Sequence, residues 1–330
     1  MLLTTSVAAL LAVTAQAAAT QTPQTDTTVA VTQGTRLHVK NVGGDIVVRA
    51  WDRNQVRIQA SHSRRTSVVV ERGGAVLSIE SRASRGPSNM VDYQLTVPTW
   101  MALELGGMYA VVDIDGVRAP ITVETLEGDV TVKGGAEQVK VTSVQGRISV
   151  QGATGRIEVN SVSEDVEIAD VQGDVVVEGV SGDIMLRRVQ ARTVEIETVS
   201  GELVFDGRIV DGGRYSLLTH SGDITLSIAE NTNATLNTAI GSGDVRATFA
   251  LPTTDRPGRR RQSFRFGSGS ASIEAETFSG DVRLFRPAEL DTRLQQREEA
   301  RRRARAAVKP KPEHDEHDAH PAGALFEPRS

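Results

Sequence analysis

The acidic side chains that recur at regular intervals are the residues of this sequence with the clearest potential for chemistry. Aspartate follows glycine, or stands in the corresponding place, many times in the middle and late parts of the chain. Carboxylates stacked at a constant spacing could bind divalent cations, as in the nonapeptide rolls that bind calcium. The aspartates that could form such a row are Asp129, Asp165, Asp183, Asp223, Asp244 and Asp281.

The alternative is that these residues close turns. Glycine adopts positive φ angles at little cost, and aspartate accepts hydrogen bonds from nearby backbone N–H groups. The Gly-Gly-x-Gly-x-Asp turn of calcium rolls is absent, and Arg147 and Arg156 occupy turn positions where calcium would require aspartate. We therefore expect a structural role, without metal, cofactor or catalysis, for these turn residues: Gly44, Asp45, Gly128, Asp129, Gly146, Gly173, Asp174, Gly182, Asp183, Gly201, Gly222, Asp223, Gly243, Asp244, Gly280 and Asp281.

Other reactive side chains form no catalytic pattern. No Ser–His–acid order or metal-ligand spacing stands out. His220 occupies a slot that Val199 and Phe278 fill elsewhere, which favours a core or turn position. A carbohydrate-active enzyme would need a cleft with converging carboxylates and often aromatic platforms, whereas aromatic residues make up only 4% of the chain. We therefore expect a protein that is not an enzyme.

Charged segments late in the chain could contact a partner. Three adjacent arginines, Arg259 to Arg261, lie in what we expect to be a solvated loop between Leu251 and Phe266. The arginines at 301–303 lack the interleaved aromatic residues that would stack on bases, so we expect no nucleic-acid partner. The C-terminal tail could bind transition metals weakly through its histidines, which are His314, His317 and His320.

The elements that must position these side chains are short β-strands with a nine-residue period. Val130 and Val132 form an alternating apolar pair, and similar pairs recur in both directions. Two residues separated by one lie on the same face of a strand, so each pair points inward. One strand cannot bury that face alone, but stacked repeats bury a continuous column. The other pairs are Val112/Ile114, Ile121/Val123, Val139/Val141, Ile148/Val150, Ile157/Val159, Val166/Ile168, Val175/Val177 and Ile184/Leu186.

Successive units alternate between two kinds of turn, which doubles the structural repeat. One kind reads like Ser143-Val144-Gln145-Gly146, and the other is looser, as in Asp170-Val171-Gln172-Gly173. In turns of the first kind, Gly128 and Gly146 are separated by two nine-residue units. The separation is longer between Gly201 and Gly222. The sequence therefore predicts an all-β fold, a parallel β-helix or β-solenoid with about 18–21 residues and two strands per coil. Inward positions at intervals of two and seven exclude the hexapeptide helix of acyltransferases.

These repeats resemble a bacterial family of β-strand repeat proteins that are called adhesins and form a domain of unknown function. The resemblance covers about Thr35 to Pro287. Its motifs are the turns Thr198-Val199-Ser200-Gly201-Glu202-Leu203 and Thr277-Phe278-Ser279-Gly280-Asp281-Val282, the entry Val42-Gly43-Gly44-Asp45-Ile46-Val47-Val48 and the step Val97-Pro98. The resemblance implies an exported β-solenoid without established catalytic residues.

The first residues have the pattern of an export signal. Met1 to Ala19 is a short apolar stretch with the small-residue pattern Ala15-Gln16-Ala17, although it lacks Lys or Arg at its start. It is short for a membrane span of about 20 apolar residues, and no later segment approaches that length. We expect a signal peptide and a mature chain without a transmembrane segment. The protein would then be periplasmic, at the cell surface or extracellular.

The periodicity changes at both ends of the repeats. Residues 35–100 are rich in strands but irregular, and 288–308 has helix-forming residues with i,i+4 charge pairs. The last residues are rich in proline, acid and histidine, which favours disorder. The expected organisation is a signal peptide at 1–19, a flexible lead at 20–34, an irregular N-terminal β segment or cap at 35–100, the regular solenoid at 101–287, a charged helix at 288–308 and a disordered tail at 309–330.

Composition restricts the function further. The chain has 330 residues, a formal net charge of −5 and no cysteine. The lack of cysteine excludes disulfides, thiolate metal sites and cysteine nucleophiles. We expect a non-catalytic, adhesin-like or structural binding module of the cell envelope, whose partner, such as a surface glycan or an envelope protein, is unknown. The alternatives are a periplasmic scaffold or sensor in envelope signalling and a carbohydrate-active β-helix enzyme.

Overall fold

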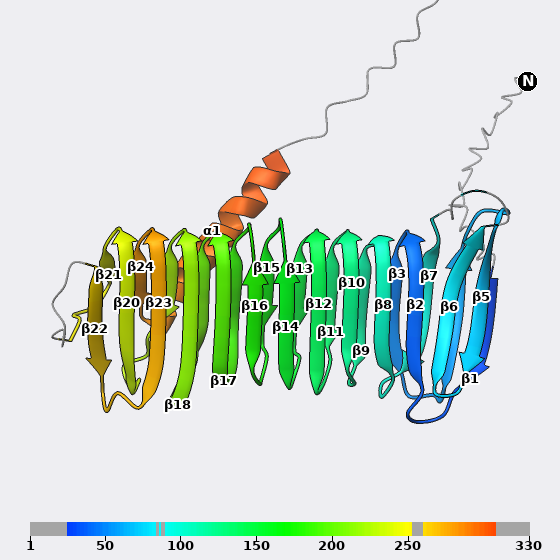
Figure 1. Cartoon of the computed structure of the whole chain (residues 1–330), viewed down its shortest axis with the longest axis horizontal. Coiled ribbons are helices and arrows are strands. Elements are labelled where there is room, and N and C mark those ends of the chain that lie inside the picture. Colours follow the sequence, from blue (N-terminus) through cyan, green and yellow to red (C-terminus); the bar gives the residue numbers. More distant parts are fainter. Residues whose placement is uncertain (1–24, 84–85, 87–89, 253–259, 308–330) are drawn as a thin grey trace, which may run out of the picture. The chain divides into compact units, whose positions relative to one another are not determined.

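The computed structural model describes residues 25–83, 86, 90–252 and 260–307. The described residues between Thr25 and Pro287 form one compact unit, a β-solenoid in which the strands lie side by side along its length (Figure 1). The second unit contains the helix α1 (Pro287–Ala307), which begins with proline and carries Glu289 in its first turn. Both features favour a helix N-terminus. The expected signal peptide and C-terminal tail lie outside the described residues.

The regular part of the solenoid consists of two columns of parallel strands, here named column A and column B. Column A contains β8 (Ala102–Tyr109), β10 (Ile121–Glu127), β12 (Gln138–Gln145), β14 (Arg156–Ser161) and β16 (Val175–Gly179). Column B contains β9 (Val112–Val117), β11 (Val130–Gly134), β13 (Ile148–Gln151) and β15 (Val166–Ala169). The long strands β17 (Ile184–Ser200) and β18 (Leu203–Ser221) each begin in column B and end in column A.

The register confirms the coil length that the sequence predicts. Ile121 pairs with Val139, which is the equivalent residue two nine-residue units later. Between β17 and β18 the coil lengthens, because Ile184 pairs with Leu203 and, after two irregularities in the register, Val194 pairs with Tyr215. The predicted β-solenoid and its C-terminal helix are therefore confirmed.

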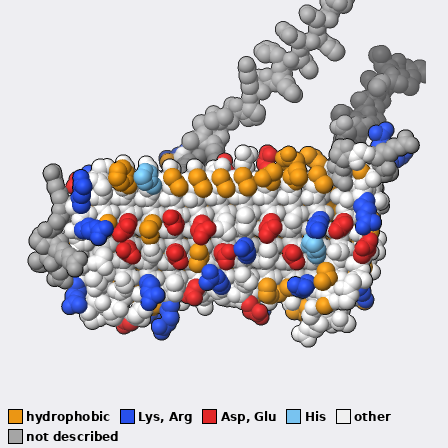
Figure 2. Space-filling view, viewed as in Figure 1, with side chains coloured by type: hydrophobic (Ala, Val, Ile, Leu, Met, Phe, Trp, Pro, Cys, Tyr) orange, Lys and Arg blue, Asp and Glu red, His pale blue; other side chains and the backbone are white. Residues whose placement is uncertain are grey.

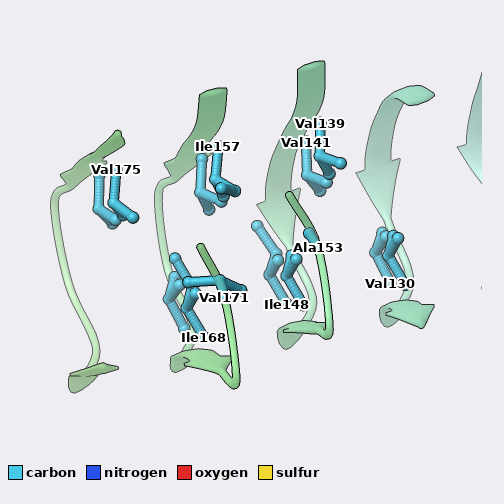
Figure 3. Close-up of a cluster of buried hydrophobic side chains, with 14 of the residues drawn as sticks. Val130, Val139, Val141, Ile148, Ala153, Ile157, Ile168, Val171 and Val175 are labelled. Atoms are coloured by element: carbon cyan, nitrogen blue, oxygen red, sulfur yellow. The ribbon is translucent and has the colours of Figure 1, made fainter. Parts of the chain in front are cut away.

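The core is a stack of aliphatic side chains from both columns, as Figure 3 shows for Val130, Val139, Ile148 and Ile157. A third side is closed by the looser turns, whose apolar residues Ala153, Val171 and Val189 are fully buried. Isolated parallel bridges connect these turns, from Thr154 to Gln172 and from Gln172 to Gln190. The looser turns therefore contribute a third row to the core, which the two-strand interpretation of the sequence did not include.

The coils at the C-terminal end are not stacked in chain order. The chain forms β19 (Ile224–Ser227), β20 (Ala234–Ser242), β21 (Val245–Ala247) and β22 (Arg261–Phe266) before β23 (Ala271–Ser279) and β24 (Val282–Phe285). In space, however, β23 lies between β18 and β20, and β24 lies between β19 and β21. The last coil in the sequence therefore fills a gap between two earlier coils (Figure 1).

The N-terminal end has the same kind of arrangement. The coil of β2 (Arg36–Gly43) and β3 (Ile46–Trp51) lies between the coil of β8 and β9 and the later coil of β6 (Val76–Ala83) and β7 (Asp92–Pro98). Antiparallel strands complete this end. They are β1 (Thr25–Ala30), β4 (Gln55–Ser61) and β5 (Thr66–Gly73).

Two expectations about irregular segments are wrong. Residues 25–30 of the expected flexible lead form β1, which pairs with β4, and its polar side chains are tolerated because it is an edge strand. Arg261–Phe266, expected within a loop, form the strand β22 antiparallel to β20. Phe264 and Phe266 alternate into the core there, and this burial outweighs the neighbouring charges.

Glycine is required where one turn stacks on the next. Gly201 has φ 135°, and a Cβ atom on it would lie 2.1 Å from the carbonyl oxygen of Gly182 in the neighbouring coil. Gly212 also has a positive φ, 70°, but a Cβ atom there would meet no atom within 4 Å. The two glycines separate the effect of backbone conformation from the effect of close approach.

We expect Gly201→Ala to destabilise the solenoid by about 3 kcal/mol, because the coils must move apart as well as accept a strained φ. Gly212→Ala should cost only about 1 kcal/mol for the positive φ. Urea unfolding followed by circular dichroism measures both. Equal losses for the two variants would contradict the close packing of the turns.

Candidate interaction surface

The row of aspartates joins neighbouring coils by hydrogen bonds. In each case a carboxylate oxygen accepts the backbone N–H of the equivalent residue in the next coil. The pairs are Asp92 with Asp45 N at 3.0 Å, Asp129 with Arg147 N at 2.8 Å, Asp165 with Asp183 N at 3.0 Å, Asp183 with Glu202 N at 3.1 Å, Asp223 with Asp281 N at 2.8 Å and Asp281 with Asp244 N at 3.1 Å.

Asp281 shows the electrostatic consequence most clearly. The N–H of Asp244 holds the pKa of the Asp281 carboxyl below its usual value, against the opposing effect of burial, and Arg246 and Arg283 act in the same direction as the N–H. Among the described residues, no group of three or more His, Asp or Glu side chains is arranged to hold a metal ion. The aspartate row thus holds the turns together.

The other turn residues follow two rows. Gly44, Gly128, Gly146, Gly182, Gly201, Gly222, Gly243 and Gly280 all have positive φ angles in the turn from column A to column B. Gly173, with φ 131°, lies in the opposite turn, where a Cβ atom would meet the carbonyl oxygen of Gly155 at 1.9 Å, and Asp174 follows it. The turn residues therefore pack backbone against backbone.

The position before each turn from column A to column B points outward and is apolar in most coils; His220 occupies it in the coil of β18 and Gly241 in the coil of β20. The residues at this position, here named the apolar ladder, lie one per coil in register and are Val42, Met108, Leu126, Val144, Val162, Val180, Val199, His220 and Phe278. Val199 is 50% exposed and Phe278 is 64% exposed. Figure 2 shows the hydrophobic side chains as a row along one edge of the solenoid.

The ladder broadens into a patch at one end. Met90, Tyr109 and Val111 are exposed apolar residues of the first coils, next to Val42 and Met108 in the turns. Along the ladder itself, the residue before each of several members is small or polar and buried, as with Thr125, Ser143, Ser161, Thr198, Thr219 and Thr277. The Thr277 hydroxyl, for example, donates to the carbonyl oxygen of Gly222 in the neighbouring coil. The motif therefore buries its hydroxyl residue and exposes its apolar one.

The sheet face beside the ladder is acidic. The outward side chains of column A include these glutamates: Glu104, Glu124, Glu158, Glu178, Glu195, Glu197, Glu274 and Glu276. Rows of acidic side chains below the hydrophobic row are visible in Figure 2. Lys140 pairs with Glu158 at 2.8 Å, a hydrogen bond that lowers the pKa of Glu158. The apolar ladder thus has a largely negative surface on one side.

A groove lies at the other end of the ladder. Its volume is about 450 Å³, and it is formed by β17, β18, β20 and β23 together with Arg260 and Arg261. The rings of His220 and Phe278 are stacked, with centroids 5.0 Å apart and an angle of 2° between their planes. His220 is not a core residue, because its side chain is exposed at the end of β18, directly before the turn.

The outward position of the ladder residues could have been predicted from the alternation of side chains along each strand. Val194 and Ile196 point inward in β17, so Thr198 points inward and Val199 outward. The acidic row and the Arg260 side of the groove depend on which coils are neighbours, and chain order does not give this at the C-terminal end. His38 lies on the outward face of column A beside Glu104, whereas His62 lies at the N-terminal end, where its Nε2 is 2.8 Å from the Thr25 hydroxyl.

The family comparison agrees with the fold. The model of the family Toastrack DUF4097 matches residues 34–285. A crystal structure of a "putative cell adhesion protein" from Clostridium sporogenes is similar over 79% of this chain and 99% of that chain, with 10% sequence identity and a TM-score of 0.20. No curated protein matches the sequence.

Lowering the pH should weaken the hydrogen bonds that the aspartate row accepts and so lower the stability of the solenoid. Because the pKa of folded Asp281 is lowered, its contribution to stability is complete above the unfolded pKa of about 4 and is lost as the pH falls through the folded value. We expect the stability difference between wild type and Asp281→Asn to shrink between about pH 5 and about pH 2. Urea midpoints at each pH measure this difference.

The matched control is Asp115→Asn, because the Asp115 carboxylate makes no hydrogen bond or ion pair with the described residues. This variant should show little difference from wild type at any pH. A constant difference between wild type and Asp281→Asn across the same pH range would show that the carboxylate does not stabilise the turn by accepting the N–H.

Proposed function

This chain belongs to the Toastrack DUF4097 family, and we propose that it is an exported, non-catalytic binding module of the cell envelope. The observation that carries the proposal is the apolar ladder. Most of its residues are about half exposed, and they repeat at the same turn position from coil to coil. Core packing does not account for an apolar residue at these positions, because the side chains point away from the core.

The energetics favour a covered ladder. Each square ångström of apolar surface removed from water contributes about 25 cal/mol, so a partner that covers several ladder side chains gains several kcal/mol in gross terms. Contiguous exposed apolar surfaces on soluble proteins mark interaction sites. Solenoids commonly bind through such extended surfaces.

The charge beside the ladder indicates the chemistry of the partner. The outward glutamates of column A, such as Glu124, Glu178 and Glu197, would attract basic groups next to the apolar contact. We propose an envelope protein that presents apolar side chains flanked by lysine or arginine. Like charges would disfavour an acidic partner at the same surface.

Export is the second part of the proposal. The apolar stretch 1–19 supports it, and the mature chain would begin near Ala18. Among the described residues, no helix is both long and apolar enough to cross a membrane. The protein would act in the periplasm, at the cell surface or outside the cell. We propose that the mature chain consists of a short N-terminal segment that contains β1, the cap at 35–100, the solenoid at 101–287, and the charged helix and tail that follow.

Adding charge to the ladder should abolish binding to envelope material. In the variant Val162→Asp/Val180→Asp, two exposed ladder residues would oppose burial in an apolar contact, and we expect at least a tenfold loss of affinity, about 1.4 kcal/mol. Co-sedimentation of the purified mature chain with envelope fractions measures the binding. The control Thr131→Asp/Ser149→Asp adds the same charge to the outward face of column B.

Equal binding by both double variants would contradict a function of the ladder. A chain that ends at residue 287 separates the ladder from the charged helix and tail. Retained binding places the interaction on the solenoid, whereas loss of binding with an intact ladder would favour the scaffold or sensor alternative.

The export signal is tested separately. We expect the full chain, expressed in a Gram-negative host, to be shortened at its N-terminus and recovered with the periplasmic or secreted fraction. Deletion of residues 2–19 should leave the protein in the cytoplasm. Intact mass measurement and cell fractionation report both results. An uncleaved chain in the cytoplasm would contradict export.

A further inference from the structure

The groove at the Phe278 end of the ladder differs chemically from the rest of the surface, and we propose that it binds a pyranose ring of a glycan chain. This inference rests on the proposed binding role and names a ligand class for one end of the ladder. It depends on three observations, which are a flat aromatic platform, an apolar floor and charged side chains that have no partner among the described residues.

The platform is the outer face of the Phe278 ring, because the His220 ring stacks against its other face. The two rings are almost parallel, and Phe278 is 64% exposed. A stacked pair holds both rings in one orientation, so little side-chain entropy remains to be lost on binding. One face of a pyranose ring presents a patch of C–H bonds, and such a patch packs favourably against the negative face of an aromatic ring.

The floor of the groove is apolar. Leu218, Ala239 and Ile240 line it beside the platform. The volume of about 450 Å³ falls in the range of about 300–1,000 Å³ that is typical of small-ligand sites. The groove is therefore large enough for a ring that lies flat, and its floor would contact the C–H groups of that ring.

The polar groups around the groove are available to a ligand. Glu197 and Glu276 occupy outward positions on either side of Leu218, because Leu218 pairs with both residues. Arg260 and Arg261 also line the groove. None of these four side chains makes a hydrogen bond or ion pair with the part of the chain that the structure describes.

This combination fits a sugar better than a purely apolar ligand. The carboxylates accept hydrogen bonds from hydroxyl groups, and the guanidinium groups donate to hydroxyl or carboxylate oxygens. An apolar ligand would leave these charges without partners while it displaced their water, which costs free energy. The hydroxyl rim of a pyranose ring satisfies both kinds of group, and its C–H face contacts the platform.

Binding of defined oligosaccharides to the mature chain tests the proposal. The probes are cellohexaose, chitohexaose, maltohexaose and an oligogalacturonate, and isothermal titration calorimetry measures their affinities. We expect saturable binding of at least one probe. Phe278→Ala should weaken it at least tenfold, and Glu276→Gln should weaken it as well.

The matched control is Leu126→Ala, which truncates a ladder residue in the same turn position several coils away from the groove. It should bind the probe like wild type. Phe278 is exposed, so its replacement should leave the unfolding midpoint close to that of wild type, which separates a loss of binding from a loss of folding.

The outcomes distinguish this inference from the proposed function. No binding of any probe, or binding that Phe278→Ala leaves unchanged, overturns the saccharide site; envelope binding that depends on Val162 and Val180 would still stand. Binding followed by cleavage of the oligosaccharide supports the saccharide site and contradicts a non-catalytic function. Binding that Phe278→Ala and Leu126→Ala weaken equally also overturns the proposal, because the groove would then have no special role.

Discussion

Backbone hydrogen bonds hold neighbouring coils at the spacing of paired strands, about 4.8 Å, and every other feature of the solenoid follows from this spacing. At this distance, residues in the same place of successive coils become direct neighbours. Inward valines become a continuous core, and glycines become stacked turns in which no Cβ atom fits, as at Gly201 against Gly182. Aspartates come within reach of the next N–H, as at Asp223 and Asp281. The exposed apolar ladder arises from the same rule.

The ends of the solenoid show how the stack of coils is terminated. At each end, one coil lies between two coils that are its neighbours in space but not in sequence. Antiparallel strands then form most of the outermost positions, with β22 beside β20 at one end and β5 beside β6 at the other, while the short β21 is a parallel edge strand beside β24. A parallel edge left open would be a template for pairing with other chains. The altered strand direction at the ends interrupts that template.

Sequence reasoning predicted the parts of the fold that depend on local pattern. The nine-residue pairs and their register from coil to coil are local, so the coil length could be read directly. The position of β23 could not, because the turn before Gly243 and the turn before Gly280 carry the same kind of motif, and either would satisfy the neighbouring coil. The strand β22 was missed because its charges concealed the alternation of Phe264 and Phe266. The groove could not be predicted, since Glu197, Phe278 and Arg260 come together only through the order of the coils.

We propose that one edge of the solenoid, the apolar ladder with its acidic flank, is the surface that meets a partner. Hydroxyl-radical footprinting of the full-length mature chain, with and without envelope material, measures the accessibility of each side chain directly. We expect Leu126, Val162 and Phe278 to lose reactivity when the envelope material is present, while Met185, an outward residue of column B, keeps its reactivity. Unchanged reactivity along the ladder, or protection confined to column B, would contradict it.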